Sequence, residues 1–595
     1  MNKTASIPEV GDRRRAPAGA SGIRRWLAIL GPPAFFVVLT IVMTWPLVLH
    51  AGDSVVGRIG DNIYFVWMMA WFKKTIFDLH VSPIAVPQLN YPEGWSLAYT
   101  EIAPSELALG FPVSLVWGPI LGYNVALLLT FVLSGYFMHL WVNDLTGSPG
   151  AGLIAGTVFA FIPFRVAHFL SGHLNVAGTL WFPLYFMGLS DLLFGRRPRR
   201  AIVLTGLSLG LIALTTMYYL YMTLLISGIA VVAYLVLFDR SGIGDVQRWK
   251  RMALALLVSA PLVVAGSFPF IQLAGQGGLP SRSVDSVVSG SASVTDFVLP
   301  STDHFIWGSW IAEHFNRDHW MEGTLYLGAV ALPLALLGVF RLKDDPRYRN
   351  LIRLLALASS AAFILALGTN LHWLEELVRL PVPAFLQGVV DRESISIRLP
   401  GYYMFQYFPL FSKLRTFKRF SVFVLLSVGA LSGFGAAWIE TRVRHWRSAI
   451  VLGLLALIFL DFYPGPYVDF AKIQARPVDY WLATQPGEGL VAQFPFYQEE
   501  DQDQIYNTLI HGKPFLGGFF NAFPPAQYSR IRPVMEGFPD DASVALLNEL
   551  NVEYVIVDSS AYPGFPIVLK EIESLGMPAI GVFGKDYVFH LPASP

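Results

Sequence analysis

The stretch from Ala201 to Phe238 reads AIVLTGLSLGLIALTTMYYLYMTLLISGIAVVAYLVLF and contains no charged residue. It is long enough to cross a bilayer twice, because one transmembrane helix needs about 20 apolar residues. Tyr218, Tyr219 and Tyr221 lie near its middle, where an aromatic belt at the membrane interface would surround a tight turn. The stretch therefore predicts two antiparallel transmembrane helices joined by that turn.

The composition of the whole chain agrees with this local pattern. Of its 595 residues, 54% are hydrophobic and 14% are charged, whereas soluble proteins carry about 25% charged residues. Apolar runs recur along most of the length, which predicts a polytopic α-helical membrane protein. The absence of cysteine excludes disulfides, thiolate metal ligands and cysteine nucleophiles. A net charge of zero argues against a nucleic-acid partner.

Charged loops set the predicted topology. The apolar stretch 105–120 is short and interrupted by Pro112 and Pro119, so we interpret it as re-entrant or interfacial. The basic run from Arg196 to Arg200 then falls in the cytoplasm, as the positive-inside rule requires. About eleven spans are predicted, at 26–48, 122–142, 149–169, 177–195, 201–216, 219–238, 252–273, 323–340, 351–368, 420–439 and 448–463.

This topology divides the chain into three regions. We expect a cytoplasmic N-terminal tail at 1–25, a transmembrane domain at 26–463, and an external soluble α/β domain at 464–595. The long external loops are 49–121, 274–322 and 369–419. Long loops in compact proteins are commonly functional. The predicted location is the cell inner membrane, with the C-terminal domain on the external or periplasmic side.

Asp61 is the first candidate for chemistry. It follows the first apolar span, in the sequence Gly60-Asp61-Asn62, where water would meet lipid. One interpretation makes it a general base that takes a proton from an acceptor hydroxyl. The other makes it the N-cap of the apolar helix that follows.

Two further acids follow in the same predicted external loop. Glu93 lies in Asn90-Tyr91-Pro92-Glu93-Gly94, a turn by composition, and Glu101 comes shortly after it. A second acid beside Asp61 would permit proton transfer or binding of a divalent cation through hard oxygen ligands. A divalent cation is therefore a candidate cofactor, and the sequence spacing specifies no metal.

Histidines mark two other loops on the predicted external side. His173 and Asn175 occupy a tight turn between two spans, near His168, and would face the same vestibule as Asp61. The loop 296–322 holds acid–histidine pairs, among them Asp303-His304, Glu313-His314 and Asp318-His319. This loop is either a zinc or manganese site or a polar surface.

A basic cluster breaks the charge rule that the other loops obey. Arg415, Lys418 and Arg419 precede the span at 420–439 on the predicted external side. They could reach lipid headgroups by snorkelling. Alternatively, Arg415 and Arg419, four residues apart on one helical face, would bind a phosphate, because guanidinium groups match phosphate geometry.

Together these motifs resemble the GT-C superfamily of polytopic glycosyltransferases, with YfhO-like and dolichyl-phosphate-mannose-dependent enzymes the most similar. The resemblance rests on short motifs across the chain: Gly60-Asp61-Asn62, Asn90-Tyr91-Pro92-Glu93-Gly94, Gly172-His173-Leu174-Asn175 with Trp181-Phe182-Pro183-Leu184, the segment Leu414 to Phe420, and His511-Gly512-Lys513-Pro514 with Leu550 to Val555. It implies a donor sugar on a polyprenyl phosphate and a catalytic acid at Asp61. Many such enzymes carry two adjacent acids there; here the neighbour is Asn62.

The expected function is inverting transfer of a sugar from a polyprenyl phosphate to a glycan, lipid or protein acceptor at the outer membrane surface. Asp61 would act as base, and Arg415 and Arg419 would hold the phosphate. The substrate-binding site would be completed by Glu93, Glu101, His173, Asn175, Asp303, His304 and Lys418. The alternatives are a flippase for a lipid-linked glycan, which would need polar residues inside spans and a repeat, and a non-catalytic membrane scaffold.

Overall fold

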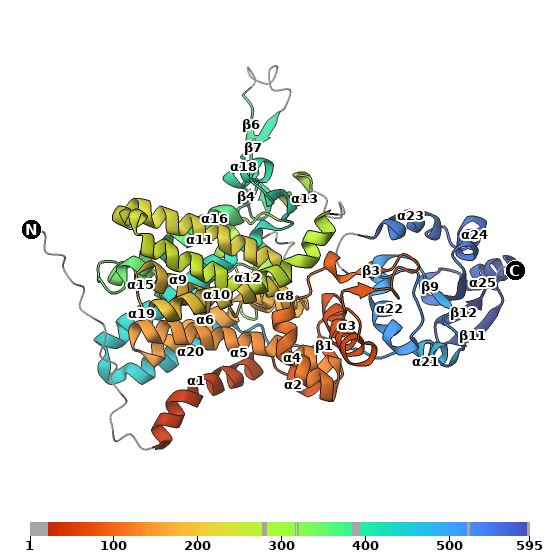
Figure 1. Cartoon of the computed structure of the whole chain (residues 1–595), viewed down its shortest axis with the longest axis horizontal. Coiled ribbons are helices and arrows are strands. Elements are labelled where there is room, and N and C mark those ends of the chain that lie inside the picture. The colour runs from red at the N-terminus through yellow and green to blue at the C-terminus, as the bar shows by residue number, and fades with distance from the viewer. Residues whose placement is uncertain are drawn as a thin grey trace, which may run out of the picture.

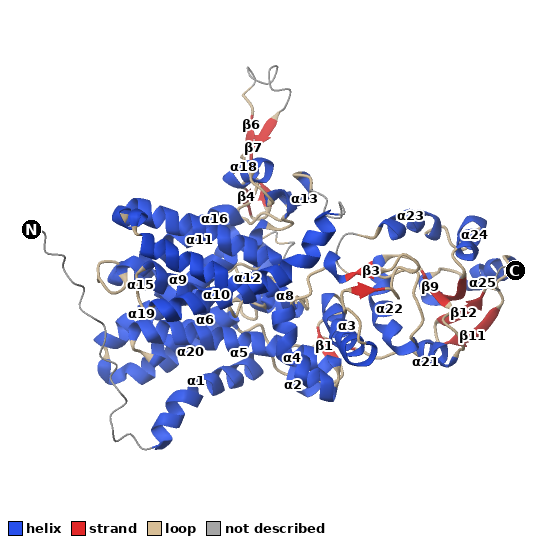
Figure 2. Cartoon of the chain, in the orientation of Figure 1, coloured by secondary structure: helices blue, strands red, loops and turns tan. Residues whose placement is uncertain are grey.

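The computed structural model describes residues 22–275, 282–315, 317, 321–383, 393–520 and 524–591. A bundle of long helices forms one part of the molecule, and a smaller lobe of mixed helices and strands forms the other (Figure 1). Strands gather in that lobe and in a projecting hairpin, whereas the bundle is helical (Figure 2). This arrangement confirms the predicted fold class. The domain boundaries stay predictions, and residues 1–21 of the predicted tail lie outside the described residues.

The bundle and its loops hold most of the helices. The long helices and their short partners are α1 (Gly22–Met43), α4 (Pro104–Trp117), α5 (Pro119–Thr146), α6 (Pro149–Phe161), α7 (Pro163–Leu170), α8 (Leu174–Ala177), α9 (Phe182–Leu193), α10 (Pro198–Thr215), α11 (Met217–Phe238), α12 (Val246–Gly275), α15 (Ala331–Leu342), α16 (Arg349–Ala366), α19 (Val422–Arg442) and α20 (Arg447–Phe462). The connecting loops carry α2 (Leu47–His50), β1 (Ser54–Val56), α3 (Asp61–Lys73), β2 (Ala85–Val86), β3 (Trp95–Ser96), α13 (Asp285–Val288), η4 (Val294–Phe297), α14 (Gly308–His314), β4 (His372–Trp373), β5 (Glu376–Leu377), β6 (Arg379–Pro381), β7 (Ser394–Ser396), α18 (Pro400–Tyr407), η5 (Phe411–Lys413) and η6 (Phe417–Ser421).

The predicted count of eleven spans is not confirmed. Among the described residues, eight helical segments are long and apolar enough to cross a membrane, and the bent pair α6–α7 would make a ninth. Shorter apolar helices, Ala28–Met43 and Ala331–Leu342, lie where two further spans were predicted. Helix α4 is not among the candidate spans, as expected for the stretch that contains Pro112. The chain is thus a multi-pass membrane protein.

Helix α19 forms the centre of the bundle and is buried along most of its length. Small residues let its neighbours approach closely. A Cβ atom on Gly435 would lie 2.0 Å from the backbone oxygen of Leu334, and one on Gly433 would lie 2.8 Å from the Cβ of Ala155. Membrane helices associate through such small residues, because apolar burial adds little inside lipid. Glycines therefore fix where α15 and α6 cross the central helix.

The C-terminal lobe contains a four-stranded sheet in the order β11-β12-β10-β9. Strand β10 (Val552–Asp558) runs parallel to β9 (Leu490–Phe494) and antiparallel to β12 (Asp586–His590), which also pairs antiparallel with β11 (Ala579–Phe583). The remaining elements are β8 (Phe470–Lys472), α21 (Pro477–Thr484), α22 (Gln498–His511), α23 (Ala526–Met535), α24 (Asp541–Glu549) and α25 (Phe565–Ser574). The predicted α/β character of this region is confirmed.

The lobe is joined to the first long loop of the bundle by backbone pairing and by aromatic packing. Strand β1 pairs antiparallel with β8. The Phe515 N–H donates to the Gln88 carbonyl at 2.8 Å. Phe520 packs against Tyr64 and Trp67 of α3, with ring centroids 4.5 and 5.2 Å away. Helix α3 is consequently held between the bundle and the lobe (Figure 1). We call this end of the bundle the mouth.

Candidate functional site

Asp61 is the first residue of α3, and Gly60 occupies the N-cap position. The neighbouring Asn62 closes the preceding turn: its side-chain oxygen accepts from the Gly60 N–H and its amide donates to the Arg58 carbonyl, both at 2.9 Å. The Asn62 side chain is therefore structural, whereas the Asp61 side chain is 23% exposed. A carboxylate in the first turn is favoured by the partial positive charge of a helix N-terminus.

The turn between α7 and α8 brings a histidine to Asp61. Gly172 in this turn has a φ of +71°, and a Cβ atom there would lie 2.6 Å from the backbone nitrogen of Asn62. Only glycine permits that approach together with that backbone conformation. The result is a contact of 3.2 Å between His173 Nε2 and Asp61 Oδ2. Two loops distant in sequence thus form one acid–imidazole pair.

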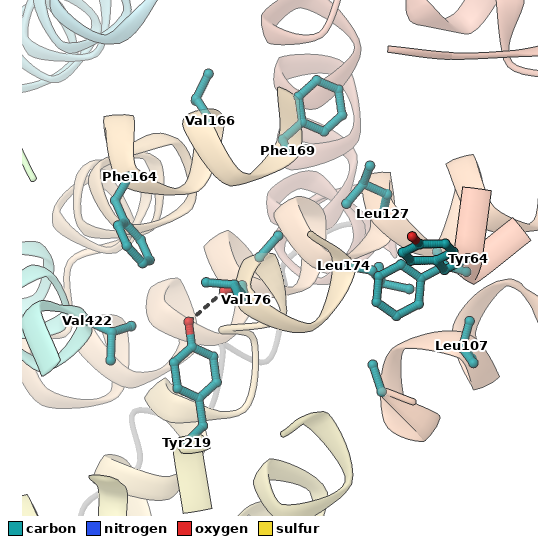
Figure 3. Packing of buried hydrophobic residues seen from close by; sticks show 14 of the residues in the cluster. Tyr64, Leu107, Leu127, Phe164, Val166, Phe169, Leu174, Val176, Tyr219 and Val422 are labelled. Atoms are coloured by element: carbon teal, nitrogen blue, oxygen red, sulfur yellow. Dashed lines mark hydrogen bonds between the residues drawn. The ribbon is translucent and has the colours of Figure 1, made fainter. Parts of the chain in front are cut away.

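A second histidine continues the contact inward. The Nδ1 atoms of His168 and His173 lie 2.8 Å apart, so one must donate a hydrogen to the other. His168 is fully buried on α7. The short helices α7 and α8 that carry this pair are anchored by apolar side chains such as Phe164 and Val176, and the Tyr219 hydroxyl donates to the Val176 carbonyl at 2.7 Å (Figure 3).

Glu322 and Arg419 complete the chain of contacts. Glu322 Oε2 lies 3.6 Å from His168 Nε2. Glu322 Oε1 accepts from Arg419 Nη2 at 2.7 Å and from Arg419 Nε at 3.2 Å. The guanidinium also lies over the Tyr218 ring, 5.7 Å from its centroid. The second terminal nitrogen, Nη1, makes no hydrogen bond to the described part of the chain, so one edge of this arginine is available to a ligand.

Two carboxyl groups beside Arg419 have opposite acidities. Burial alone would raise the pKa of Glu322, but the charges of Arg419 and His168 outweigh it and lower the pKa to about 2. Burial raises the pKa of Glu101 to about 7, although the Thr216 hydroxyl, the Arg419 charge and a backbone N–H oppose the rise. One carboxyl group is thus ionised at neutral pH, while the other titrates near it.

The three basic residues of the predicted cluster point to different surroundings. Thr416 is extended and the helical turn begins only at Phe417, so the prediction that Arg415 and Arg419 share a helical face is wrong. Arg415 is exposed, whereas Lys418 is 3% exposed. Lys418 lies near Asp296 of η4; burial raises the pKa of Asp296 to about 6, against the charges of Arg317 and Lys418. Arg419 alone belongs to the chain that reaches Asp61.

The other predicted site residues lie outside this chain of contacts. Glu93 forms an exposed ion pair with Arg530 of α23 at 3.0 Å. His304 Nε2 donates to the Asp461 carbonyl at 2.8 Å while its Nδ1 accepts from two backbone N–H groups at the start of α14, so both nitrogens are used. Asp303 is exposed next to it, and Asn175 is half-buried on α8. Their binding roles stay predictions.

Within the described residues, no cluster of side chains is arranged to hold a metal ion. No group of three or more His, Asp or Glu side chains within the described ranges has metal-binding geometry. In the chain from Asp61 to Glu322, two imidazoles separate the two carboxylates, so the oxygens do not converge. Asp318 and His319, from the predicted zinc or manganese loop, lie outside the described residues. A divalent cation therefore stays a prediction without a site.

Comparison with known proteins places the fold. The structure is similar to the crystal structure of the Archaeoglobus fulgidus oligosaccharyltransferase in the apo form, with a TM-score of 0.53 and 13% identity, covering 92% of this chain and 71% of that chain. It also resembles ArnT from Cupriavidus metallidurans bound to undecaprenyl phosphate, with a TM-score of 0.47 and 11% identity over 96% of this chain and 99% of that chain. The predicted GT-C fold is confirmed. No match is found among curated protein sequences. A family described as a domain of unknown function (DUF6311) matches residues 33–437, more than half of the sequence, and the chain belongs to that family.

Proposed function

We propose that the protein transfers a sugar from a polyprenyl-phosphate donor to an acceptor hydroxyl or amide at the mouth of the bundle. The observation that carries this proposal is the continuous chain from the Asp61–His173 pair to Arg419, an arginine with one free edge. A base and a phosphate-binding group within one site are the two elements that displacement of a sugar from a phosphate requires. The oligosaccharyltransferase-like fold supports the same class of reaction.

The proposed reaction is a single displacement at the anomeric carbon. Asp61 accepts the acceptor's proton as the acceptor atom forms its bond to that carbon. The bond between the carbon and the phosphate oxygen breaks, and its electron pair leaves with the phosphate. Arg419 Nη1 donates to the phosphate oxygens and stabilises their increasing charge. Because the acceptor attacks opposite the leaving group, the anomeric configuration is inverted.

The position of the site suits a donor whose lipid tail stays in the bilayer. The chain of contacts lies at the mouth, where α7 meets α8 and α10 meets α11. The basic run from Arg196 to Arg200 spans the N-terminal end of α10 and so lies at the opposite end of that helix from the mouth. By the positive-inside rule, that end is cytoplasmic and the mouth is on the outer face of the inner membrane. Sugars on polyprenyl phosphates would enter from the lipid with their phosphate near Arg419.

Replacement of Asp61 tests this proposal. In membranes supplied with a labelled polyprenyl-phosphate sugar and native membrane acceptors, wild-type protein moves label out of the donor lipid. We expect Asp61→Asn to lower the rate by about 10²–10⁴-fold, the contribution of a general base. Asp78→Asn is the matched control, because Asp78 is an exposed acid in the same loop and should transfer normally.

The same experiment separates transfer from its alternatives. Wild-type protein that moves intact donor between leaflets without releasing the sugar would replace the enzyme with a flippase. If wild-type protein neither transfers the sugar nor moves the donor between leaflets, the non-catalytic scaffold is the hypothesis that remains. Retention of full transfer by Asp61→Asn, with transfer by wild type, would remove Asp61 from its role.

A further inference from the structure

The two carboxylate oxygens of Glu322 face two different partners, Arg419 and His168. Oε1 accepts from two nitrogens of Arg419, while Oε2 faces His168 Nε2 at 3.6 Å. Both Oε2 and His168 Nε2 are buried without a hydrogen-bond partner. Buried polar atoms are rarely left unpaired, and each such case calls for an explanation. The Arg419 side of this carboxylate is satisfied, whereas the histidine side is not.

The unpaired atoms follow from the hydrogens that two neutral imidazoles can supply. If His173 donates from Nε2 to Asp61, its Nδ1 must accept from His168, and His168 Nε2 is left as an acceptor facing Glu322. If instead His168 donates from Nε2 to Glu322, then His173 donates from Nδ1, and its Nε2 is an acceptor facing Asp61. The 2.8 Å contact between the two Nδ1 atoms permits either arrangement.

The other charged and titratable groups around the pair come from several elements. They are Asp61 on α3, Tyr123 on α5, whose hydroxyl donates to the Gly172 carbonyl, Glu322 in its loop, and Arg419 on η6, with Glu101, Tyr218 and Tyr219 next to Arg419. Asp61 and Glu322 lie at opposite ends of the imidazole pair, and among the described residues Arg419 supplies the fixed positive charge in contact with Glu322. The pair therefore lies between two anions with one cation shared at the Glu322 end.

We propose that Glu322 is a positioning residue that couples phosphate binding at Arg419 to proton acceptance at Asp61 by selecting the tautomer of the His168–His173 pair. This inference rests on the proposed function. Without donor, Arg419 satisfies Glu322. When a phosphate binds Arg419, the guanidinium charge is shared between the phosphate and Glu322. Glu322 Oε2 then accepts a hydrogen bond from His168 Nε2. His173 Nε2 then becomes an acceptor beside Asp61.

This coupling determines which group finally accepts the proton of the acceptor. The acceptor loses its proton to Asp61, and Asp61 passes a proton from Oδ2 to His173 Nε2 across the 3.2 Å contact. An O–H bond breaks, an N–H bond forms, and Asp61 is again ionised. The His173 imidazolium that results contacts the Asp61 carboxylate directly and is linked to the Glu322 carboxylate through His168. Deprotonation of the acceptor is thus most favourable when the donor phosphate is in place.

Glu322→Gln tests the coupling, because the amide oxygen still accepts from Arg419 while the charge on the histidine side is lost. We expect kcat to fall by about 10²-fold, the low end of a general base's contribution, with a changed pH dependence and a nearly unchanged KM for the donor. His168→Asn should reproduce the change in pH dependence, because it breaks the link and leaves the Arg419–Glu322 pair intact. Glu313→Gln, an exposed acid of the same segment, is the control.

A second readout does not depend on turnover. Affinity for undecaprenyl phosphate, measured from about pH 5 to about pH 9 on full-length protein in nanodiscs, should depend on pH, because phosphate binding at Arg419 is linked to the protons of the groups around it. That dependence should flatten in both Glu322→Gln and His168→Asn. A raised KM with an unchanged pH profile and unchanged pH-dependent binding would make Glu322 a simple support of Arg419 and overturn the inference. Lack of transfer by wild type would instead overturn the proposed function.

Discussion

Arg476 in the C-terminal lobe and Arg419 at the mouth are both paired with carboxylates, but they use their guanidinium groups differently. All three nitrogens of Arg476 donate, to Asp479, Gln493, Gln504 and Asp586. Arg419 donates to one oxygen of Glu322 through two nitrogens and keeps Nη1 free of hydrogen bonds to the described residues. Five N–H groups are available in each case.

We interpret this difference as one between an arginine that stabilises a fold and one that is proposed to bind a ligand. Arg476 joins α21, β9, α22 and β12, so its neighbourhood is closed and complete. Arg419 is oriented from one side by Glu322 and Tyr218, which leaves the other side for a substrate anion. A buried ion pair is by itself weak evidence of function. The number of guanidinium N–H groups that make no hydrogen bond is a more informative sign of a binding role.

The largest expected effect on transfer comes from substitution of Arg419. We predict that Arg419→Gln lowers kcat by about 10²–10³-fold, as loss of one preorganised donor to a developing anion does. The reason is that the departing phosphate would lose its cationic partner. Transfer assays with labelled polyprenyl-phosphate sugar measure the effect, and a variant with more than half of wild-type kcat would show that Arg419 is as structural as Arg476.

Substitution of Arg476 should instead affect stability and leave transfer unchanged. We predict that Arg476→Gln destabilises the C-terminal lobe by about 3 kcal/mol, because removal of one partner leaves buried carboxylates uncompensated. Urea unfolding followed by lobe fluorescence measures the loss. Transfer per folded molecule should stay near the wild-type rate. A variant that unfolds normally but loses turnover would erase the contrast between the two arginines.

The smallest expected effect is on the pH dependence of stability. The pKa of Glu322 is lowered from 4.5 to about 2, so its stabilisation is present above about pH 4.5 and is lost as the pH falls toward 2. The pKa of Glu101 is raised from 4.5 to about 7, so stability falls as the pH rises between those values.

Thermal unfolding across this pH range separates the two carboxyl groups. Glu322→Gln should flatten the acid side of the curve, and Glu101→Gln should remove the decline toward neutral pH. Equal slopes in both variants and the wild type would mean that the two groups share one environment.

Sequence alone predicted the membrane fold, the α/β lobe and the elements that carry the site. Hydropathy located the long helices because apolar length is a local property, whereas the apolar helices at 28–43 and 331–342 are shorter than the two spans predicted there. Asp61, His173 and Arg419 were selected as candidates because each lies at a loop-to-helix junction on one predicted side of the membrane, and their roles stay predictions.

The remaining features depend on contacts between distant segments. Glu322 was one acid among several in its loop, and only its position between His168 and Arg419 distinguishes it. The structural use of Asn62 depends on a turn that begins at Arg58, and both nitrogens of His304 are occupied by backbone groups that a sequence pattern does not reveal. The prediction that Arg415 and Arg419 share a helical face was wrong because the helical turn starts only at Phe417.

The anomeric configuration of the transferred sugar tests the central claim most directly. The full chain is incubated with a polyprenyl-phosphate sugar of defined anomeric configuration, and the configuration of the product linkage is read from its carbon–proton coupling by NMR. One displacement assisted by Asp61, with the phosphate leaving against Arg419, predicts a fully inverted linkage. A retained linkage would contradict the account, because it requires a covalent intermediate that this arrangement does not provide.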